Sequence, residues 1–563
     1  MYIRIFNNIY PSQVLLLEAG GEEPEVADVP AFAPMLQSSS IDWGFRTQAD
    51  PKSCLARTNG QCSWARGKVM GGSSVINYMI YIRGNPRDYD EWAERGNIGW
   101  SYEEVLPYFI KSEDNHNIDK VAPYKHGVGG YLSVEMFNYQ DENVLTLLRA
   151  FEEVGLPLID QNSGKQIGGS LLQTTSRNGR RESANIAFIR PIRRKRRNLV
   201  IETEAYALRV LIDPHTKTAY GVEYEKNGRL IRATAKKEVI VSCGAIMSPK
   251  LLMLSGIGPA EHLQNFGIPV IKDLPVGYNL QDHTTIDGLM FSLTNRTATT
   301  TTDEQMRHDV FYYREEGEGP LSSTGPLQVN AFVQTKYEFE PGRPDIQYSI
   351  DATNVRNMVT QPILAAETKV TPLAYYNGLV IRPILLNPES RGVIKLNHTD
   401  PWYGYPLIYA NTFEEEIDLL RIVEGIKQSL NLLKTQALQK IGVNLVTTPL
   451  PACDNIRFGT DEYWVCMVRS YTSTIYHYSG TCKMGPRHDR GAVVDPQLRV
   501  YGIKNLRVID TSIMPRVVRG NTNAPTIMIA EKGSDMIKST WLKKKGLQGM
   551  NFKQMIKNLF LNH

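Results

Sequence analysis

Residues 67–77 read GKVMGGSSVIN, and this glycine-rich stretch carries the most information about the fold. Its paired glycines, Gly71 and Gly72, let backbone N–H groups approach a bound ligand closely, and the two serines that follow add hydroxyl donors. Such a loop is typical of a site for a pyrophosphate or for the edge of a flavin. A flexible GGSS turn is the simpler alternative, so the interpretation depends on the rest of the chain.

Short apolar runs that end in an acid or a glycine occur on both sides of this loop. Residues 14–17 (VLLL) lead into Glu18, and residues 238–242 (EVIVS) lead into Cys243-Gly244. Residues 505–509 (NLRVI) end at Asp510 in the same way, and a helix is predicted after them, at about 524–539. Such runs are typical of buried parallel strands, so the sequence predicts a nucleotide-binding α/β domain.

The middle of the chain has a different character. Over residues 284–470, strand-like pieces alternate with loops, and a single long helix is predicted at about 413–435. We therefore expect a substrate domain at 284–470, threaded through a nucleotide-binding domain that spans 11–283 and returns at 471–540. Residues 541–563 are predicted to form a solvated basic tail.

The composition excludes several classes of function. Of the 563 residues, 42% are hydrophobic and 22% charged, which allows a large core and excludes wholesale disorder. The net charge of +4 is too small to indicate nucleic-acid binding. No apolar run approaches the roughly 18–20 residues of a membrane span. The absence of any CxxC pair speaks against a structural zinc site, and we expect no metal.

The signals for the cellular compartment disagree. Cysteine stands at both ends of two short loops, residues 54–62 and 453–466. Each pair could form a disulfide, which implies an oxidising compartment, or all four could be free thiols. The sequons at Asn295 and Asn397 are compatible with secretion. In contrast, residues 1–10 lack the apolar run of a signal peptide.

The sequence resembles the glucose–methanol–choline (GMC) family of FAD-dependent oxidoreductases. Residues 67–90 fit the first signature of that family except at Met70, where Leu, Ile or Val is usual, and residues 244–258 (GAIMSPKLLMLSGIG) fit the second. Three further blocks follow in the family's order: 273–283 (DLPVGYNLQDH), 480–485 (GTCKMG) and 520–526 (GNTNAPT). Within the family, the sequence looks like the insect glucose dehydrogenase branch.

The resemblance implies a fold and a reaction. The fold is a Rossmann-like FAD/NAD(P)-binding α/β domain, interwoven with an α+β substrate domain built on an antiparallel sheet. The reaction is oxidation of a CH–OH group of an alcohol or sugar, with the hydride passing to flavin N5 and the electrons then to a quinone-like acceptor or oxygen.

The resemblance also implies the catalytic pair. His477 falls where the family places its active-site histidine, and Asn523 falls where it carries a second His or Asn. Asn521, two residues earlier, is the alternative to Asn523. An imidazole suits removal of the hydroxyl proton, and an amide suits a hydrogen bond to the developing alkoxide. Arg516 and Arg519, in the loop before this pair, either face solvent, the simpler interpretation, or favour an anionic substrate or acceptor.

The contacts to FAD follow from the same resemblance. Glu18 is expected to accept hydrogen bonds from the adenosine ribose, as an acid at the end of the second strand does in dinucleotide-binding units. Ala207 stands where the family usually has a valine that contacts adenine through its backbone. The other implied contacts lie along the pyrophosphate and the flavin ring: Gly71, Gly72, Ser73, Asn77, Asp510, Thr511, Ala524 and Thr526.

The start of the chain departs from the family pattern. A Rossmann unit carries G-x-G-x-x-G roughly 20 residues before its acid, whereas the 17 residues before Glu18 contain no glycine. Residues 1–6 could form a substitute strand but not the pyrophosphate turn, so the first βα unit is missing. Two interpretations remain open. The sequence is a truncated or wrongly started version of a normal, secreted enzyme, or it is a non-catalytic GMC-fold protein that binds FAD weakly or not at all.

Overall fold

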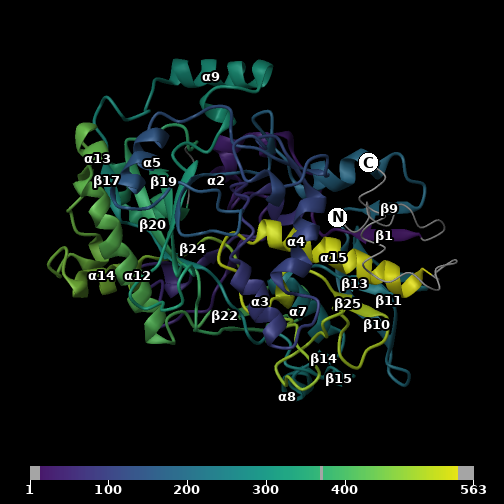
Figure 1. Cartoon of the computed structure of the whole chain (residues 1–563). Coiled ribbons are helices and arrows are strands. Elements are labelled where there is room, and N and C mark those ends of the chain that lie inside the picture. The colour runs from purple at the N-terminus through teal and green to yellow at the C-terminus, as the bar shows by residue number, and fades with distance from the viewer. Residues whose placement is uncertain (1–12, 368–371, 543–563) are drawn as a thin grey trace.

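A computed structural model describes residues 13–367 and 372–542 of the chain (Figure 1). The predictions for residues 1–6 and for nearly all of the basic tail lie outside the described residues. Two parts with different sheets are visible. Parallel strands gather on the right of Figure 1, near the yellow helix α15 (Asn523–Trp541), and an antiparallel sheet lies on the left, beside the green helices.

The predicted parallel strands form two separate pairs. Strand β1 (Val14–Leu17) pairs with β9 (Leu199–Glu202), and β13 (Val239–Val241) pairs with β25 (Leu506–Val508). Among the described residues, no hydrogen-bonded strand joins one pair to the other. In a doubly wound sheet of order 3-2-1-4-5, the first strand lies between the acid-ended second strand and the fourth. The gap among the described strands therefore falls at the position that the first strand of such a sheet would take.

Strand β1 is less buried than predicted. Leu15 is 39% exposed, and the other residues of the strand are only partly buried. The strand has a parallel neighbour on one edge only among the described residues, so part of its apolar surface lacks the cover that an inner strand receives.

The rest of this part surrounds a large core. Strands β10 (Tyr206–Asp213), β11 (Thr218–Lys226) and β12 (Arg229–Thr234) form an antiparallel three-stranded sheet. Helix α7 (Gly244–Leu254) follows β13, and its buried face and that of α15 enter the same hydrophobic core as β13 and β25. The helix predicted at about 524–539 is thereby confirmed as α15.

The predicted antiparallel sheet of the second part is confirmed. Its six strands follow the order β23-β17-β20-β19-β18-β6, and every neighbouring pair is antiparallel. The strands are β6 (Gly168–Leu171), β17 (Met290–Ser292), β18 (Val329–Val333), β19 (Ile346–Thr353), β20 (Gly378–Leu385) and β23 (Asn444–Leu445). Strand β6 comes from well before residue 284, so the sheet extends into the segment expected to belong to the nucleotide-binding domain.

Helix α12 (Glu416–Ser429) covers one face of this sheet. It is shorter than the predicted helix at about 413–435, because the chain tightens into a 3₁₀ helix at Leu430–Lys434. Its apolar side chains, such as Ile422 and Ile426, pack with Ile346 and Ile350 of β19. The opposite face of β19 is left to border a cavity between the two parts.

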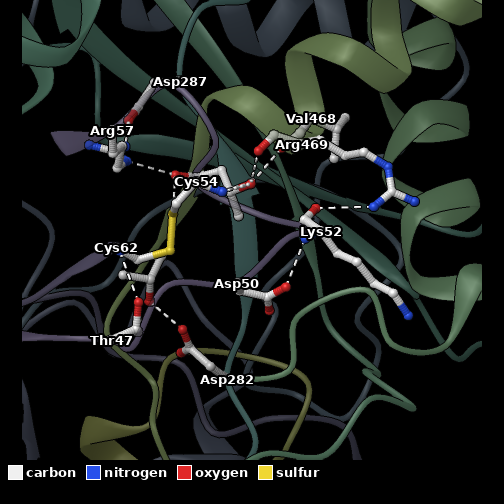
Figure 2. Close-up of a disulfide and its surroundings, with 12 residues drawn as sticks. Thr47, Asp50, Lys52, Cys54, Arg57, Cys62, Asp282, Asp287, Val468 and Arg469 are labelled. Carbon is white, nitrogen blue, oxygen red and sulfur yellow. Dashed lines mark hydrogen bonds and ion pairs between the residues drawn. A yellow bond between two sulfur atoms is a disulfide. The ribbon is translucent and has the colours of Figure 1, made fainter. Parts of the chain in front are cut away.

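Both disulfides form. Cys54 pairs with Cys62 and Cys453 with Cys466, with Cα–Cα distances of 5.6 and 6.0 Å. The disulfide interpretation of these loops is therefore confirmed. Figure 2 shows the first bridge, which closes a loop that carries Arg57. Within residues 13–367 and 372–542, none of the helices combines the length and apolarity that a membrane crossing requires.

Candidate active site

A cavity of about 550 Å³ lies between the two parts and collects nearly all of the residues singled out in the sequence. Those that line it are Glu18, Gly71, Gly72, Ser73, Asn77, Ala207, His477, Asp510, Thr511, Asn521, Asn523 and Thr526. Ala524 differs from them. It is buried in the hydrophobic core at the first turn of α15, and it does not line the cavity.

Glu18 marks one end of the cavity. It follows β1, and the N–H of Gly20 donates to its Oε1 at 2.8 Å. Its backbone is hydrogen-bonded to the segment that follows β9, because the N–H of Ala205 donates to the Glu18 carbonyl at 2.8 Å. Burial raises the pKa of Glu18 to about 7. A carboxyl can accept several hydrogen bonds, and the two hydroxyls of a ribose would add donors to the one that Gly20 supplies.

The glycine-rich loop has a backbone conformation that depends on its glycines. Gly71 has φ +110° and Gly72 has φ +60°, a region that side chains disfavour. A Cβ on Gly71 would lie 2.8 Å from Val75 Cγ2, whereas a Cβ on Gly72 would meet no atom within 4 Å. Ser74 Oγ donates to the Gly71 carbonyl at 2.7 Å and fixes the bend. The backbone at Gly72 is thus open to a ligand in the cavity.

A buried arginine supports this loop from behind. Arg181 donates from Nη1 to the carbonyl of Asn77 at 2.6 Å, to its side-chain Oδ1 at 2.8 Å, and to the carbonyl of Ser74 at 3.2 Å. Burial lowers the pKa of Arg181 to about 10. Its guanidinium positions Asn77 and places positive charge close to the loop, which suits an anionic ligand.

Asp510 connects the second strand pair to helix α7. One oxygen accepts from the N–H of Gly244 at 2.9 Å and from the hydroxyl of Ser248 at 2.6 Å, and the other accepts from the N–H of Ser512 at 2.8 Å. Both oxygens are therefore engaged within the chain, and the carboxylate fixes the start of α7 beside the cavity.

His477 lies at the other end of the cavity and has three polar neighbours. Its Nδ1 is 2.8 Å from Nδ1 of His283, and its Nε2 is 3.3 Å from the amide nitrogen of Asn521. The backbone N–H of His477 donates to Asp282 Oδ1 at 3.0 Å. The hydrogen-bonded asparagine is thus Asn521, the alternative two residues before Asn523.

These contacts fix the tautomer of His477. Burial lowers the pKa of both histidines, to about 3 for His283, so both rings are neutral near pH 7. Two neutral rings that share an Nδ1–Nδ1 contact need one donor and one acceptor. With the amide nitrogen of Asn521 facing Nε2, that atom is the acceptor. The proton of His477 is therefore on Nδ1, and its basic lone pair is on Nε2.

Charged groups around His477 reinforce this state. Arg66 lies with its guanidinium 4.2 Å from the centre of the Tyr478 ring and donates to the Tyr476 carbonyl at 2.6 Å. Its positive charge further lowers the pKa of His477. Desolvation raises the pKa of Asp282, which is partly buried, to about 7, and its carboxylate accepts from Thr474 Oγ1 at 2.5 Å.

One expectation about the loop before Asn521 is wrong. Arg519 does not face solvent: it is buried, and its Nη1 pairs with Asp88 Oδ1 at 2.5 Å. The paired carboxylate explains the burial, because a guanidinium in the interior needs a counterion. Arg516 is partly exposed and pairs with Glu389 at 2.6 Å.

Sequence reasoning missed the residues that hold His477 and the loop in place. His283 closes the matched block 273–283, which was the one available signal, but nothing local indicates that it meets His477. Arg181 and Arg66 lie outside the sequence blocks that match the family. Their positions follow from tertiary contacts alone.

The cavity thus holds the glycine-rich loop, the Glu18 carboxyl and a buried, unprotonated histidine together. This set of groups suits an oxidoreductase with a dinucleotide cofactor. Two family models described as GMC oxidoreductase match residues 22–285 and 388–530. The chain belongs to the GMC oxidoreductase family.

Several known proteins are similar over most of the chain. Glucose dehydrogenase [FAD, quinone] of Drosophila melanogaster is 42% identical over 94% of this chain and 83% of its own length. Mitochondrial choline dehydrogenase of Homo sapiens is 37% identical over 93% of this chain and 85% of its own length. Among solved structures, formate oxidase of Aspergillus oryzae superposes with a TM-score of 0.82 at 26% identity, over 96% of this chain and 95% of its own.

Proposed function

We propose that the protein is an FAD-dependent oxidoreductase that oxidises a CH–OH group of an alcohol or sugar, with the electrons passing on to a quinone-like acceptor or oxygen. The observation that carries the proposal is the neutral His477, whose Nε2 lies in the same cavity as the glycine loop and Glu18. FAD, when bound, supplies the acceptor for the hydride. The name of the Drosophila relative, which includes both FAD and quinone, supports the cofactor and the acceptor.

Different residues of the chain would contact different parts of the cofactor. Glu18 would hold the adenosine ribose, and the backbone of Ala207 borders the adenine end of the cavity. Gly71, Gly72 and Ser73 would lie along the pyrophosphate, with Asn77, Asp510, Thr511 and Thr526 towards the ring. The open Cβ direction at Gly72 and the raised pKa of Glu18 both fit such a ligand. The buried side chain of Ala524 would act through packing.

At the catalytic end, Nε2 of His477 takes the hydroxyl proton of the substrate. The His283 Nδ1 atom accepts from the Nδ1–H of His477 and so stabilises the imidazolium that forms. Asn521 gives up its hydrogen bond to Nε2 when the substrate hydroxyl takes that place, and its amide then donates to the substrate oxygen as negative charge develops there. Burial of the His477 side chain limits its contact with bulk water.

The test is anaerobic reduction of the flavin-loaded protein by a panel of alcohols and sugars. The loss of flavin absorbance measures the reduction. We expect at least one neutral CH–OH compound to reduce the flavin, and a quinone or oxygen to reoxidise it. A flavin-loaded protein that no member of the panel reduces would contradict the proposed reaction.

A second candidate is a GMC-fold protein that binds FAD weakly or not at all. The specific observation in its favour is the separation of the β1–β9 pair from the β13–β25 pair among the described residues. A soluble, folded sample that does not retain flavin after incubation with FAD would support this candidate over the first.

We also propose that the protein acts in an oxidising, extracellular setting. Support comes from the two disulfides and from Asn295, an exposed sequon residue. Protein secreted from insect cells should have Asn295 glycosylated and both bridges closed in peptide mass spectrometry. Recovery of four free thiols at these cysteines would contradict the proposal.

A further inference from the structure

Strand β19 presents a polar row to the cavity. Its sequence, IQYSIDAT, alternates apolar and polar residues, and the side chains of a strand alternate between the two faces of a sheet. Gln347, Ser349 and Asp351 line the cavity. On the opposite face, Tyr348 donates its hydroxyl to the Gly425 carbonyl of α12 at 2.9 Å. Both faces of β19 are covered, so the polar row is not a solvent-facing edge.

Gln347 is the member of this row with unused hydrogen-bonding capacity. The residue is only 1% exposed, and its Oε1 has no hydrogen-bond partner among the described residues. Its neighbours across the sheet are Phe332 on β18 and Ile384 on β20, and both are apolar. Because a buried carbonyl oxygen needs a donor, and neither of these neighbours has one, a hydroxyl of a ligand in the cavity would supply the missing hydrogen bond.

Asp351 is the last of four oppositely charged side chains that pair in series beside the same wall of the cavity. Its Oδ2 accepts from Nε of Arg382 at 2.5 Å, and Arg382 also pairs with Asp287. Arg57 pairs with the other oxygen of Asp287 at 2.6 Å, and Figure 2 shows this pair beside the Cys54–Cys62 bridge. Two positive and two negative groups alternate, so this wall carries no net charge with which to bind an ion.

We propose that Gln347 and Asp351 recognise hydroxyl groups of an uncharged, polyhydroxylated substrate, at positions other than the hydroxyl oxidised at His477. Both side chains offer acceptor oxygens, which suit O–H donors. The apolar Leu327 and Ile384, which line the same cavity, would contact the C–H face of a sugar ring. This inference rests on the proposed function, because it assumes that His477 marks the reacting carbon.

The mechanism of discrimination follows from the buried acceptor. A substrate with a hydroxyl at Gln347 satisfies its Oε1, whereas a simple alcohol leaves that atom without a partner. A site that hydrogen-bonds a substrate group rejects analogues without that group strongly. A site that selects by size alone discriminates between analogues much less. A quaternary ammonium compound such as choline has no second hydroxyl to donate to Gln347. This wall also offers its positive charge no unpaired carboxylate.

The test compares D-glucose with 1-butanol as substrates of the flavin-loaded protein. In Gln347→Met, which keeps the length of the side chain but removes the acceptor, we expect kcat/KM for glucose to fall about tenfold. The value for 1-butanol should change less than about twofold. Tyr348→Phe, one residue along the strand and on the other face, is the matched control and should leave the ratio of the two substrates unchanged.

A second measurement does not depend on turnover. Equilibrium binding of glucose is measured in a His477→Ala background, where flavin reduction is slow, from the perturbation of flavin absorbance, and it should weaken about tenfold when Gln347→Met is added. Asp351→Asn, which disturbs the ion pair with Arg382, should weaken glucose binding at least as much, with protein stability checked by thermal unfolding. If glucose binds equally well with and without each of these two substitutions, the inference is overturned.

The two proposals fail in different ways. A wild-type protein that oxidises 1-butanol or choline but neither oxidises nor binds glucose overturns the inference and leaves the proposed function standing. A wild-type protein that binds glucose through Gln347 but reduces its flavin with no alcohol supports the inference about binding and overturns the proposed function.

Discussion

The two ends of the cavity differ in how firmly the chain holds them. At the catalytic end, His477 is buried and contacts His283, Asn521 and Asp282, each through a defined hydrogen bond. At the ribose end, Glu18 stands on a strand that has one neighbouring strand among the described residues and that leaves Leu15 39% exposed. The comparison teaches that several hydrogen bonds within the described chain hold the proposed catalytic histidine, whereas the proposed cofactor anchor at Glu18 rests on fewer contacts.

The largest effect is expected from the catalytic end. His477→Ala removes the proposed base, and we expect the rate of flavin reduction by substrate to fall by about 10²–10⁴. The flavin content should stay close to that of wild type, because the glycine loop and Glu18 are unchanged. Rapid-mixing kinetics and the absorbance of the purified protein measure the two quantities.

His488→Ala, at an exposed position outside the cavity, is the control for His477→Ala. Substrate should reduce the flavin of His488→Ala at the wild-type rate. A His477→Ala protein that keeps more than about a tenth of the wild-type rate would show that another group removes the proton.

The next effect separates two neighbouring asparagines. Asn521→Ala removes the amide beside His477 Nε2, and we expect a loss of about 100-fold in kcat. Asn523→Ala, at the start of α15, should cost much less, because no hydrogen bond joins Asn523 to His477 in the described residues. Steady-state kinetics of the two variants decide the assignment, and equal losses, or a larger loss in Asn523→Ala, would reverse it.

A smaller effect is expected at the ribose end. Glu18→Gln keeps the shape but removes the negative charge, and we expect the Kd for FAD to rise about tenfold. Glu22→Gln is the control, because Glu22 is exposed and pairs with Arg193 at 2.7 Å. Titration of the apoprotein with FAD, followed by quenching of flavin fluorescence, measures both. An unchanged Kd in Glu18→Gln would remove the acid from the cofactor site.

Glu18 also makes the affinity depend on pH. Its pKa is about 7 in the folded protein and 4.5 in the unfolded chain, so the folded, unliganded protein binds more protons between these values. The stability of the unliganded protein should therefore fall as pH rises from about 4.5 to about 7, by the contribution of this group. FAD affinity should rise over the upper part of that range, because the ionised carboxylate is the better acceptor, and Glu18→Gln should abolish both trends.

The smallest effect concerns the acid side of the activity profile. Burial and Arg66 lower the pKa of His477 well below 6.5, so this residue should remain a base throughout the range from about pH 6 to about pH 8. We expect no acid limb of kcat/KM from His477 in that range. Profiles of wild type and of Asp282→Asn test this, because Asp282 has a pKa of about 7. A limb near pH 6.5 in both proteins would belong to His477 and would contradict the expectation.

Much of the fold was predictable because its signals are local. The runs VLLL, EVIVS and NLRVI became β1, β13 and β25, and the apolar spacing near the end of the chain became α15. Strand β6, with the sequence GGSL, has no such pattern. It is a strand because it pairs with β18, and that pairing joins residues more than 150 positions apart.

The site was predictable only where a motif carries it. Glu18, the glycine loop and His477 were identified from sequence blocks. In contrast, His283 and His477 are 194 residues apart in the sequence, and Arg181 lies 104 residues from Asn77. Only the folded chain brings such pairs together, and the burial that fixes their protonation states is a property of the whole cavity.

The visible absorption spectrum of the purified protein, recorded before and after acid release of any flavin, tests the central claim most directly. A cavity that binds FAD predicts close to one flavin per chain. Flavin released by acid into the supernatant was bound non-covalently, whereas a precipitate that stays yellow retains a covalent link. A folded, soluble protein that contains no flavin and takes up none when FAD is added would contradict the claim, and the catalytic residues would then lie in a cavity with no cofactor to serve.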